Sequence, residues 1–313
     1  MTENTTRRWG EKRYHSMDYD LKKMYGEKVY KITLNGGMSC PNRDGKLGSR
    51  GCIFCSAQGS GDFAGSAQAS ISEQLLAGKQ ELLTKRPVHS YIAYFQAFTN
   101  TYGPVDYLER IYMEAIADPE VKILSIATRP DCLSKRVLAL LEKITQIKPV
   151  WVELGLQTIH ESTASYIRRG YTLDVFEEAI RNLRSIGITV IVHTILCLPG
   201  ETKDMMMETL DYLNRCDIQG IKLQLLHVLK GTDLAEDYAK EPFYSPTMEE
   251  YISLLGDSIA RLRPDLTIHR LTGDGPKELL IAPLWTSQKR TVLNKLHSYL
   301  KEQDIWQGKD YHE

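Results

Sequence analysis

Three of the six cysteines in this 313-residue chain lie within one short segment, CPNRDGKLGSRGCIFC, residues 40–55. Cys40, Cys52 and Cys55 have the spacing C-x11-C-x2-C, and the glycines and charged residues between them are typical of a loop. Three thiolates at such a spacing can bind a zinc ion or an iron–sulfur cluster. The segment therefore predicts a metal site with three sulfur ligands.

A structural zinc site needs a fourth ligand, and no obvious one lies near this segment in the sequence. His15 and His89 are candidates, but neither has local ligand spacing. The remaining cysteines, Cys132, Cys197 and Cys216, stand alone in apolar or helical contexts, where a buried, inert thiol is the usual interpretation. A [4Fe–4S] cluster held by three cysteines instead leaves one iron open, and that iron can chelate the amino and carboxylate groups of S-adenosylmethionine.

The composition is that of an ordinary globular protein, with 42% hydrophobic residues, 25% charged residues and a net charge of −1. No apolar run approaches the roughly 18 residues of a membrane span. The first residues, MTENTTRRWGEKRYH, lack the apolar stretch of a secretory signal. We therefore expect a cytoplasmic protein without a membrane partner, whose cysteines are thiols or metal ligands because the cytosol is reducing.

Short apolar, β-branched or aromatic runs recur along the chain and predict strands. These runs cover residues 29–34, 91–95, 122–127, 150–154, 188–196 and 221–226. Amphipathic patterns between them predict helices over residues 71–83, 105–116, 133–144 and 173–186. Ser70 and Glu73 form a capping box at the start of the first helix. Strands that alternate with crossover helices imply an α/β fold with a parallel sheet.

Six such units are too few for a closed barrel of eight, so we expect either an open, partial barrel or a doubly wound sheet. In both architectures ligands bind at the carboxyl ends of the strands. The unusual polar residues of this sequence do follow strand ends: the cysteine segment, then residues 96–100, 128–131, 155–157, 193–200 and His227. This coincidence predicts an active site at that edge of the sheet.

The chain beyond the sixth strand predicts helices near residues 232–240, 247–262 and 287–303, with a possible strand at 266–271. We therefore divide the chain into an arm (1–28), a core (29–240) and a carboxyl-terminal extension packed on the core (241–313). In the arm, basic residues alternate with Trp9, Tyr14 and Tyr25. Such a mixture suits single-stranded RNA, although a solvated arm is the simpler interpretation.

The cysteine segment, with Phe54 just before its last cysteine, resembles the cluster-binding loop of the radical SAM superfamily. The long first gap, TRPDCL (128–133), ELGLQTIHES (153–162) and HTILCLPGET (193–202) are similar to the Elongator-catalytic-subunit-like branch. Over nearly the whole chain the sequence resembles the bacterial YtqA/YhcC-like group, through KITLNGG, SCPNRDG, GCIFCSAQGSGDFAG, YFQAFTNTY and GDGPKELLIAPLW. The resemblance implies a partial (βα)6 TIM-type barrel with a helical carboxyl-terminal extension, a [4Fe–4S] cluster, S-adenosylmethionine and 5′-deoxyadenosyl radical chemistry.

The same resemblance implies roles for particular side chains. Cys40, Cys52 and Cys55 would bind iron, and Phe54 would shield the cluster and pack near adenine. Contacts to S-adenosylmethionine would come from Gln96, Thr99, Thr128, Arg129, Gln157, Arg169 and His193, with the arginine at 169 rather than its neighbour at 168 on the carboxylate. Cys197 stands where the family usually has glycine, and its use as a fourth cluster ligand is an alternative. The loop at 273–285 could be a lid or a substrate rim.

The group that the sequence resembles is associated with modification of the tRNA wobble uridine, U34. The resemblance implies conversion of 5-carboxymethylaminomethyl-uridine to 5-aminomethyl-uridine, with tRNA as partner and an electron donor such as flavodoxin or ferredoxin. Two alternatives remain open. One is a radical SAM enzyme with a small-molecule substrate, and the other is a zinc-binding module without catalysis.

Overall fold

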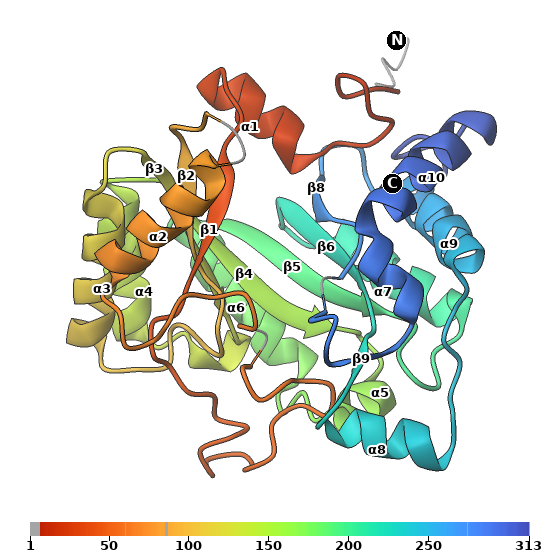
Figure 1. Cartoon of the computed structure of the whole chain (residues 1–313), viewed down its shortest axis with the longest axis horizontal. Helices are drawn as coiled ribbons and strands as arrows, with labels where there is room; N and C mark the ends of the chain where they lie inside the picture. The colour runs from red at the N-terminus through yellow and green to blue at the C-terminus, as the bar shows by residue number, and fades with distance from the viewer. Residues whose placement is uncertain (1–6, 60, 85–86, 274, 313) are drawn as a thin grey trace.

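A curled, seven-stranded parallel sheet forms the centre of the protein (Figure 1). The computed structural model describes residues 7–59, 61–84, 87–273 and 275–312. The sheet has the order β1-β2-β3-β4-β5-β6-β8, with strands Tyr30–Leu34, Tyr91–Phe95, Val121–Thr128, Val150–Gln157, Thr189–Leu196, Gly220–Leu225 and Thr267–Arg270. Strands β1 and β8 are its two edges, so the sheet is a half-barrel that is open on one side.

Five helices follow the strands in sequence and cover the outer face of the sheet (Figure 1). They are α2 (Ile71–Leu83), α3 (Val105–Ala117), α4 (Lys135–Thr145), α6 (Leu173–Ser185) and α7 (Lys203–Asn214). The predicted capping box of Ser70 and Glu73 is present at the start of α2. Every residue of β2 is buried, as expected for a parallel strand that is covered on both faces. Among the described residues, no helix is long and apolar enough to cross a membrane.

The partial-barrel prediction is confirmed and needs one addition. The strands follow one another in sequence order across the sheet, without the reversal that a doubly wound sheet requires, so that alternative is wrong. The possible strand at 266–271 forms as β8 and pairs with β6 in parallel, Ile221 opposite Ile268. The sheet therefore gains a seventh strand from the segment that the sequence placed in the carboxyl-terminal extension.

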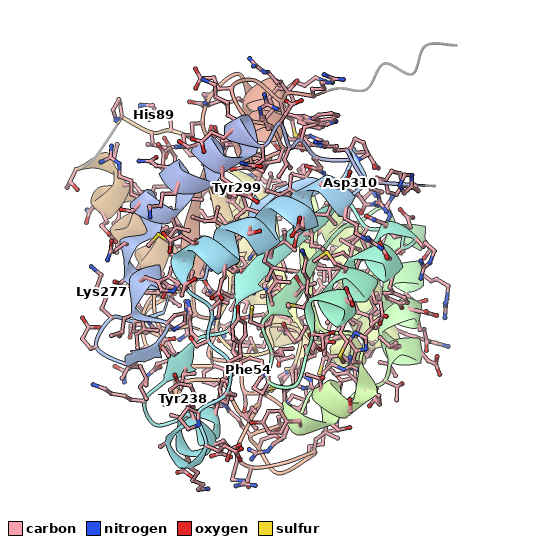
Figure 2. All side chains as sticks on the ribbon, turned by 90° about the vertical axis from the view of Figure 1, so that its right-hand side faces the viewer. Phe54, His89, Tyr238, Lys277, Tyr299 and Asp310 are labelled. Atoms are coloured by element: carbon pink, nitrogen blue, oxygen red, sulfur yellow. The ribbon has the colours of Figure 1, made fainter. Side chains whose placement is uncertain are left out.

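The rest of the carboxyl-terminal segment covers one side of the half-barrel. It contains α8 (Asp233–Lys240), α9 (Met248–Arg261), the short helix η2 (Leu284–Gln288) and α10 (Lys289–Glu302). Helices α9 and α10 pack so closely that a Cβ atom on Gly256 would lie 2.8 Å from Cε1 of Tyr299 (Figure 2). Two short strands, β7 (Val228–Leu229) and β9 (Leu280–Ala282), pair in antiparallel orientation and connect this segment to the end of β6.

The amino-terminal arm is packed against the body of the protein. Trp9 and Tyr14 are only 6% and 5% exposed, and α1 (Met17–Tyr25) follows them. Ser16 forms a parallel bridge to Ile268 in β8. The interpretation of this segment as a solvated arm is therefore wrong, and these two rings do not offer stacking surfaces to RNA. Figure 1 shows α1 at the end of the sheet opposite the cysteine loop, which is the orange segment at the bottom.

Candidate active site

One cavity at the carboxyl ends of the strands is lined by every residue that the sequence predicted for the site. The loop after β1 contributes the three cysteines and Phe54, and the later strands and their loops contribute the rest: Gln96, Thr99, Thr128, Arg129, Gln157, Arg169 and His193. Residues as far apart as 40 and 193 thus face one space. The structure confirms that they are brought together, and the role of each one stays a prediction.

The cysteine loop is held in shape by its own backbone and by Arg43. The N–H of Gly51 donates to the carbonyl of Asn42 at 2.7 Å, and the guanidinium of Arg43 donates to the carbonyls of Cys55 and Ser56 at 3.1 and 2.7 Å. Gly51 has φ of 76°, and a Cβ there would lie 2.8 Å from Nε of Arg43. Glycine is therefore favoured at this position, because a side chain would strain the backbone and displace the arginine that holds the loop.

Contacts with the segment after α5 (Glu161–Tyr166) fix the loop over the sheet. The Asn42 amide donates to the carbonyl of Arg168 at 2.7 Å, and the N–H of Ile53 donates to the carbonyl of Ile167 at 3.4 Å. The same Asn42 amide lies 3.4 Å from Sγ of Cys52. One asparagine thus joins the cysteine loop to the far side of the cavity and contacts a predicted ligand.

Cys52 is a protonated thiol in the protein without metal. Burial, together with the neighbouring Cys55, raises the pKa of its thiol to about 12, despite the opposing hydrogen bond from Asn42. A thiolate is needed to bind iron, so metal binding must displace this proton. The thiolate at this position therefore depends on a positively charged metal centre to stabilise it.

The three thiols form a donor set that suits an iron–sulfur cluster. Cys40, Cys52 and Cys55 all line one cavity. A cubane cluster takes each thiolate on a separate iron atom, so its ligands surround a shared space. The donor set therefore fits a [4Fe–4S] cluster with three cysteine ligands.

Neither histidine proposed for a Cys3His zinc site is near the cysteines. His15 stacks on Trp9 in the arm and pairs with Asp20. His89 has a side chain that is 71% exposed and pairs with Glu120. Figure 2 shows His89 at the end of the molecule opposite Phe54. The fourth ligand required by the zinc hypothesis is therefore not supplied by either residue.

Cys197 is not among the described residues that line the cavity. It is 4% exposed, its backbone has φ of 62°, and its N–H points to Sδ of Met206 at 3.1 Å. A positive φ explains why glycine is usual at this turn, since only glycine adopts it without steric cost. The alternative in which Cys197 is a fourth cluster ligand is wrong.

Gln157 offers an unsatisfied acceptor inside the cavity. It ends β4 at an irregularity in the pairing with β5 and has φ of 69°, and its Oε1 atom is buried without a hydrogen-bond partner. Buried acceptors are almost always paired in folded proteins. A ligand N–H at this position, such as an amino group of S-adenosylmethionine, would satisfy it, so this atom fits the predicted cofactor.

The two predicted arginines are also structural residues. Arg129 makes a bidentate ion pair with Asp131 at 2.9 and 2.8 Å and donates to the carbonyl of Arg169 at 2.9 Å. All three guanidinium nitrogens of Arg169 donate to protein acceptors, at the carbonyls of Tyr171 and Thr158 and the carboxylate of Glu161. Both cations thus shape the cavity wall, and the predicted carboxylate contact of Arg169 remains untested.

A buried charged cluster in the cavity floor was missed by the sequence reasoning. The carboxylate of Glu153 has no exposed surface and accepts hydrogen bonds from Nζ of Lys31 and Nε2 of His193, both at 2.7 Å. Nζ of Lys222 also contacts this carboxylate and lies 3.2 Å from the hydroxyl of Tyr94. The cluster takes one polar side chain from each of β1 to β6: Lys31, Tyr94, Ser125, Glu153, His193 and Lys222.

The electrostatics of this cluster fix the protonation of His193. Burial and the cation of Lys222 lower the pKa of His193 to about 4, and the hydrogen bond to Glu153 offsets them only in part. Burial raises the pKa of Glu153, but Lys222 and Lys31 outweigh it and hold that pKa well below its usual range. Glu153 is therefore a carboxylate that only accepts, so Nε2 of His193 carries the hydrogen and Nδ1 is an acceptor.

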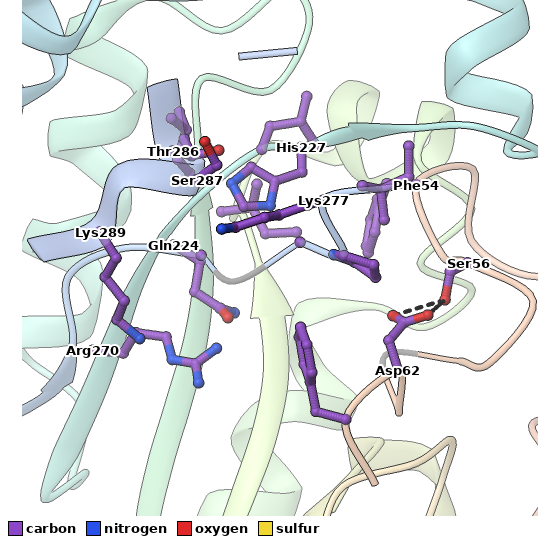
Figure 3. A pocket seen from close by; sticks show the side chains of 18 of the residues that line it. Phe54, Ser56, Asp62, Gln224, His227, Arg270, Lys277, Thr286, Ser287 and Lys289 are labelled. Carbon is purple, nitrogen blue, oxygen red and sulfur yellow. Dashed lines mark hydrogen bonds between the residues drawn. The ribbon is translucent and has the colours of Figure 1, made fainter. Parts of the chain in front are cut away.

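A larger pocket of about 610 Å³ adjoins the cysteine cavity. The two share Phe54, Gln96 and Arg270, and Figure 3 shows Phe54 and Arg270 on opposite sides of the pocket. Its cationic side chains come from the carboxyl-terminal segment: Arg270, Lys277 and Lys289, joined by His227. Gly273, Gly275, Pro276, Lys277 and Glu278 of the predicted rim loop line it, while residue 274 lies outside the described residues.

Comparison with known families identifies two matching regions. Residues 46–213 match the sequence model of the Radical SAM superfamily, and residues 218–302 match the Radical SAM C-terminal domain. The first match includes Cys52 and Cys55 but begins after Cys40, as expected if the long gap between the first two cysteines departs from the family pattern.

Similar proteins cover almost the whole chain. YtqA of Bacillus subtilis is 44% identical over 96% of this chain and 93% of its own length. YhcC of Escherichia coli is 38% identical over 91% of this chain and 92% of its own length. Among solved structures, an archaeal Elp3 from Methanocaldococcus infernus superposes with a TM-score of 0.68 at 16% identity, over 89% of this chain and 64% of that one. The last comparison shows a shared fold.

Proposed function

The chain belongs to the radical SAM superfamily of enzymes, and we propose that it acts on the wobble uridine, U34, of tRNA. In this proposal it converts 5-carboxymethylaminomethyl-uridine to 5-aminomethyl-uridine in the cytoplasm. The observation that carries the proposal is that the cysteine cavity adjoins a larger pocket in which three cationic side chains, Arg270, Lys277 and Lys289, outnumber the two carboxylates, Asp62 and Glu278. A polyanion such as RNA is the substrate class that such a pocket favours. The resemblance to the YtqA/YhcC-like group supports the same substrate.

The proposed reaction breaks the bond between the amine nitrogen and the carboxymethyl carbon. When bound, the cluster and S-adenosylmethionine supply a 5′-deoxyadenosyl radical and take back one electron, so that no net reductant is consumed. Loss of a hydrogen atom and an electron from the carboxymethyl carbon would leave an iminium ion, which becomes an imine when its nitrogen loses a proton to water. Water adds to this imine and releases 5-aminomethyl-uridine and glyoxylate, which balances the atoms.

Residues of this chain would hold and shield the reactants. Cys40, Cys52 and Cys55 would bind the cluster, and the unpaired Oε1 of Gln157 would accept a hydrogen bond from S-adenosylmethionine. Phe54 lines both cavities, and there it would shield the cluster from the outer pocket and limit the access of water. The chemistry then depends on the protein mainly through positioning and exclusion of solvent.

Nucleoside mass spectrometry tests this proposal. Cells that lack the gene should accumulate 5-carboxymethylaminomethyl-uridine in tRNA, and purified protein with flavodoxin or ferredoxin as electron donor should convert it anaerobically. Cys40→Ala, Cys52→Ala and Cys55→Ala should each abolish 5′-deoxyadenosine formation, whereas Cys216→Ala, outside the cavity, should retain it. An unchanged nucleoside profile in the deleted strain would rule out tRNA as the substrate and leave the small-molecule alternative.

The non-catalytic zinc module no longer competes with this proposal, because the chain is a radical SAM enzyme. The remaining alternative differs only in the substrate. A small molecule would be turned over by the same cavity without any dependence on RNA, so 5′-deoxyadenosine formation is compared with and without tRNA from the deleted strain. An increase caused by this tRNA supports the RNA substrate, and the absence of any effect supports a small molecule.

A further inference from the structure

We propose that Lys222, with Lys31 as its partner, recognises the carboxylate of the substrate's carboxymethyl group, and that Glu153 holds the two lysines in place. This inference deepens the proposed function and rests on it. It assigns a substrate-recognition role to the buried charged cluster, to which neither the family resemblance nor the proposed chemistry gives a task.

The cluster offers two lysines for one carboxylate. Lys31 and Lys222 share the carboxylate of Glu153, and the other groups that bond to it, Ser125 and His193, are neutral donors. Burial holds the pKa of Lys222 well below its usual range even though Glu153 opposes this shift, so one carboxylate does not fully stabilise the ammonium group. The side chains of Lys222 and Glu153 are 4% and 0% exposed, so water does little to screen the excess charge. A buried, uncompensated positive charge is costly in a folded protein. An anionic group of a ligand would remove this cost.

The position of Lys222 gives an incoming substrate access to this charge. Lys222 lines the cysteine cavity, and it also lines the opening between the edge strands β1 and β8, together with Lys31, Tyr94 and Lys289. The residue therefore lies where the two spaces meet. A uridine that enters between the edge strands would present the end of its C5 substituent, which is the carboxylate, to the ammonium group of Lys222.

Recognition at this point would serve both specificity and geometry. The carboxylate is bonded directly to the carbon that loses hydrogen, so binding it fixes that carbon relative to the cysteine cavity. The product has lost the carboxylate and keeps a cationic amine, which the net positive cluster repels. The same charge would thus favour the substrate and promote release of the product.

The proposal is tested by binding of two anticodon stem-loop RNAs, which carry 5-carboxymethylaminomethyl-uridine or 5-aminomethyl-uridine at position 34. The dissociation constants are measured anaerobically by fluorescence anisotropy, with S-adenosylmethionine present and no reductant, so that no turnover occurs. Wild-type protein should bind the RNA with 5-carboxymethylaminomethyl-uridine more tightly. Lys222→Met should lower this preference by about 10- to 100-fold, the range for hydrogen bonds to charged groups. Lys222→Arg should restore most of it.

Two further variants separate recognition from a structural role. Glu153→Gln removes the negative charge but keeps a side-chain oxygen that accepts hydrogen bonds from the lysines and holds them in place. It should therefore keep or increase the preference for the carboxylate RNA, whereas loss of a purely structural ion pair would reduce it as Lys222→Met does. Lys277→Met is the matched control, since Lys277 lines the outer pocket and is not part of the cluster. Lys277→Met should weaken the binding of both RNAs to the same extent. Iron content and thermal unfolding report whether each variant is folded.

The possible failures can be told apart. A full preference retained in folded Lys222→Met overturns the inference while the proposed function stands. The inference is also overturned if Lys222→Met binds S-adenosylmethionine more weakly but keeps its RNA preference, because the lysine would then serve the cofactor. If Lys222→Met does not fold, a reduced preference in Glu153→Gln overturns the inference. Wild-type protein that neither converts nor prefers the carboxylate RNA overturns the proposed function and the inference together.

Discussion

Several single side chains in the cavity are in states that match a bound group. The thiol of Cys52 is protonated because burial raises its pKa to about 12, so cluster assembly must release a proton there. Oε1 of Gln157 is buried without a partner. Lys31 and Lys222 share one carboxylate. A thiol, an acceptor and a cation thus face one cavity, each matched to a different part of the proposed complex of cluster, S-adenosylmethionine and substrate.

His193 should make the stability of the protein depend on pH. Its pKa is lowered from 6.5 to about 4 in the folded state, mainly by burial and by Lys222. Between these values the unfolded chain binds the proton and the folded protein does not, so stability falls as the pH decreases from 6.5 towards 4. The full effect of a shift of this size is roughly 3 kcal/mol. The variant His193→Gln should lack this pH-dependent part of the free energy of unfolding.

Urea unfolding of wild type and His193→Gln at several pH values measures this component. At pH 7.5 the variant should be less stable, because it loses the hydrogen bond to Glu153. The difference should narrow by up to about 3 kcal/mol as the pH approaches 4. His89→Gln, at an exposed position, is the control and should show no such narrowing. A difference for His193→Gln that is the same at every pH would contradict the proposed protonation state.

At the scale of elements, the second half of the cysteine loop is positioned by its contact with the loop after β2. The N–H of Phe98 donates to the carbonyl of Gly59 at 2.9 Å, and Gly59 has φ of 57°. A Cβ atom on Gly59 would lie 2.2 Å from Cδ1 of Phe98. The ring of Phe98 also lies over the guanidinium of Arg43, which holds the cysteine loop. The two loops therefore fit only with glycine at position 59.

Gly59→Ala should disturb the cluster site without unfolding the protein. The added methyl group must displace Phe98, and overpacking of this kind costs about 1–3 kcal/mol. We expect less iron per chain and weaker absorbance near 400 nm after anaerobic reconstitution. Gly45→Ala is the matched control, because Gly45 also has a positive φ, of 92°, but an added Cβ meets no atom within 4 Å. Equal iron content in the two variants would show that this contact does not position the ligands.

The strands and the helices that follow them could be predicted because their apolar periodicity is local in the sequence. The convergence of the cysteine segment with residues 96, 129, 157 and 193 could be predicted because parallel strands end at one edge of the sheet. The charged cluster could not be predicted in this way. Lys31, Glu153 and Lys222 each interrupt an apolar strand, which is the only local signal. Their contact depends on the curl of the sheet, which brings β1, β4 and β6 around one space.

At the scale of the whole molecule, the amino-terminal arm and the last turn of the chain are joined through Gln307. This side chain is fully buried and accepts from the N–H of His15 at 2.8 Å. It donates to the carbonyls of Arg263 and Leu266 at 2.8 and 2.7 Å. These partners are far away in sequence, so the arm gave no local sign that it is packed rather than solvated. The association of the two ends follows from the folded structure alone.

Gln307→Leu should destabilise the protein by about 2–4 kcal/mol, because it leaves one buried N–H and two buried carbonyls without their partner. Denaturant unfolding of the metal-free protein measures the loss. Gln303→Leu, at an exposed position near the end of α10, is the control and should change stability by less than about 0.5 kcal/mol. If both variants were equally stable, the link between the two ends would contribute little to the fold.

The most direct test of the account is the fate of the hydrogen atoms on the carboxymethyl carbon. The purified enzyme is incubated anaerobically with S-adenosylmethionine, an electron donor and tRNA in which this carbon carries deuterium, and the products are analysed by mass spectrometry. We predict one deuterium in the 5′-deoxyadenosine that is formed, together with 5-aminomethyl-uridine at position 34. Unlabelled 5′-deoxyadenosine, or an unchanged uridine after turnover, would contradict the proposed reaction.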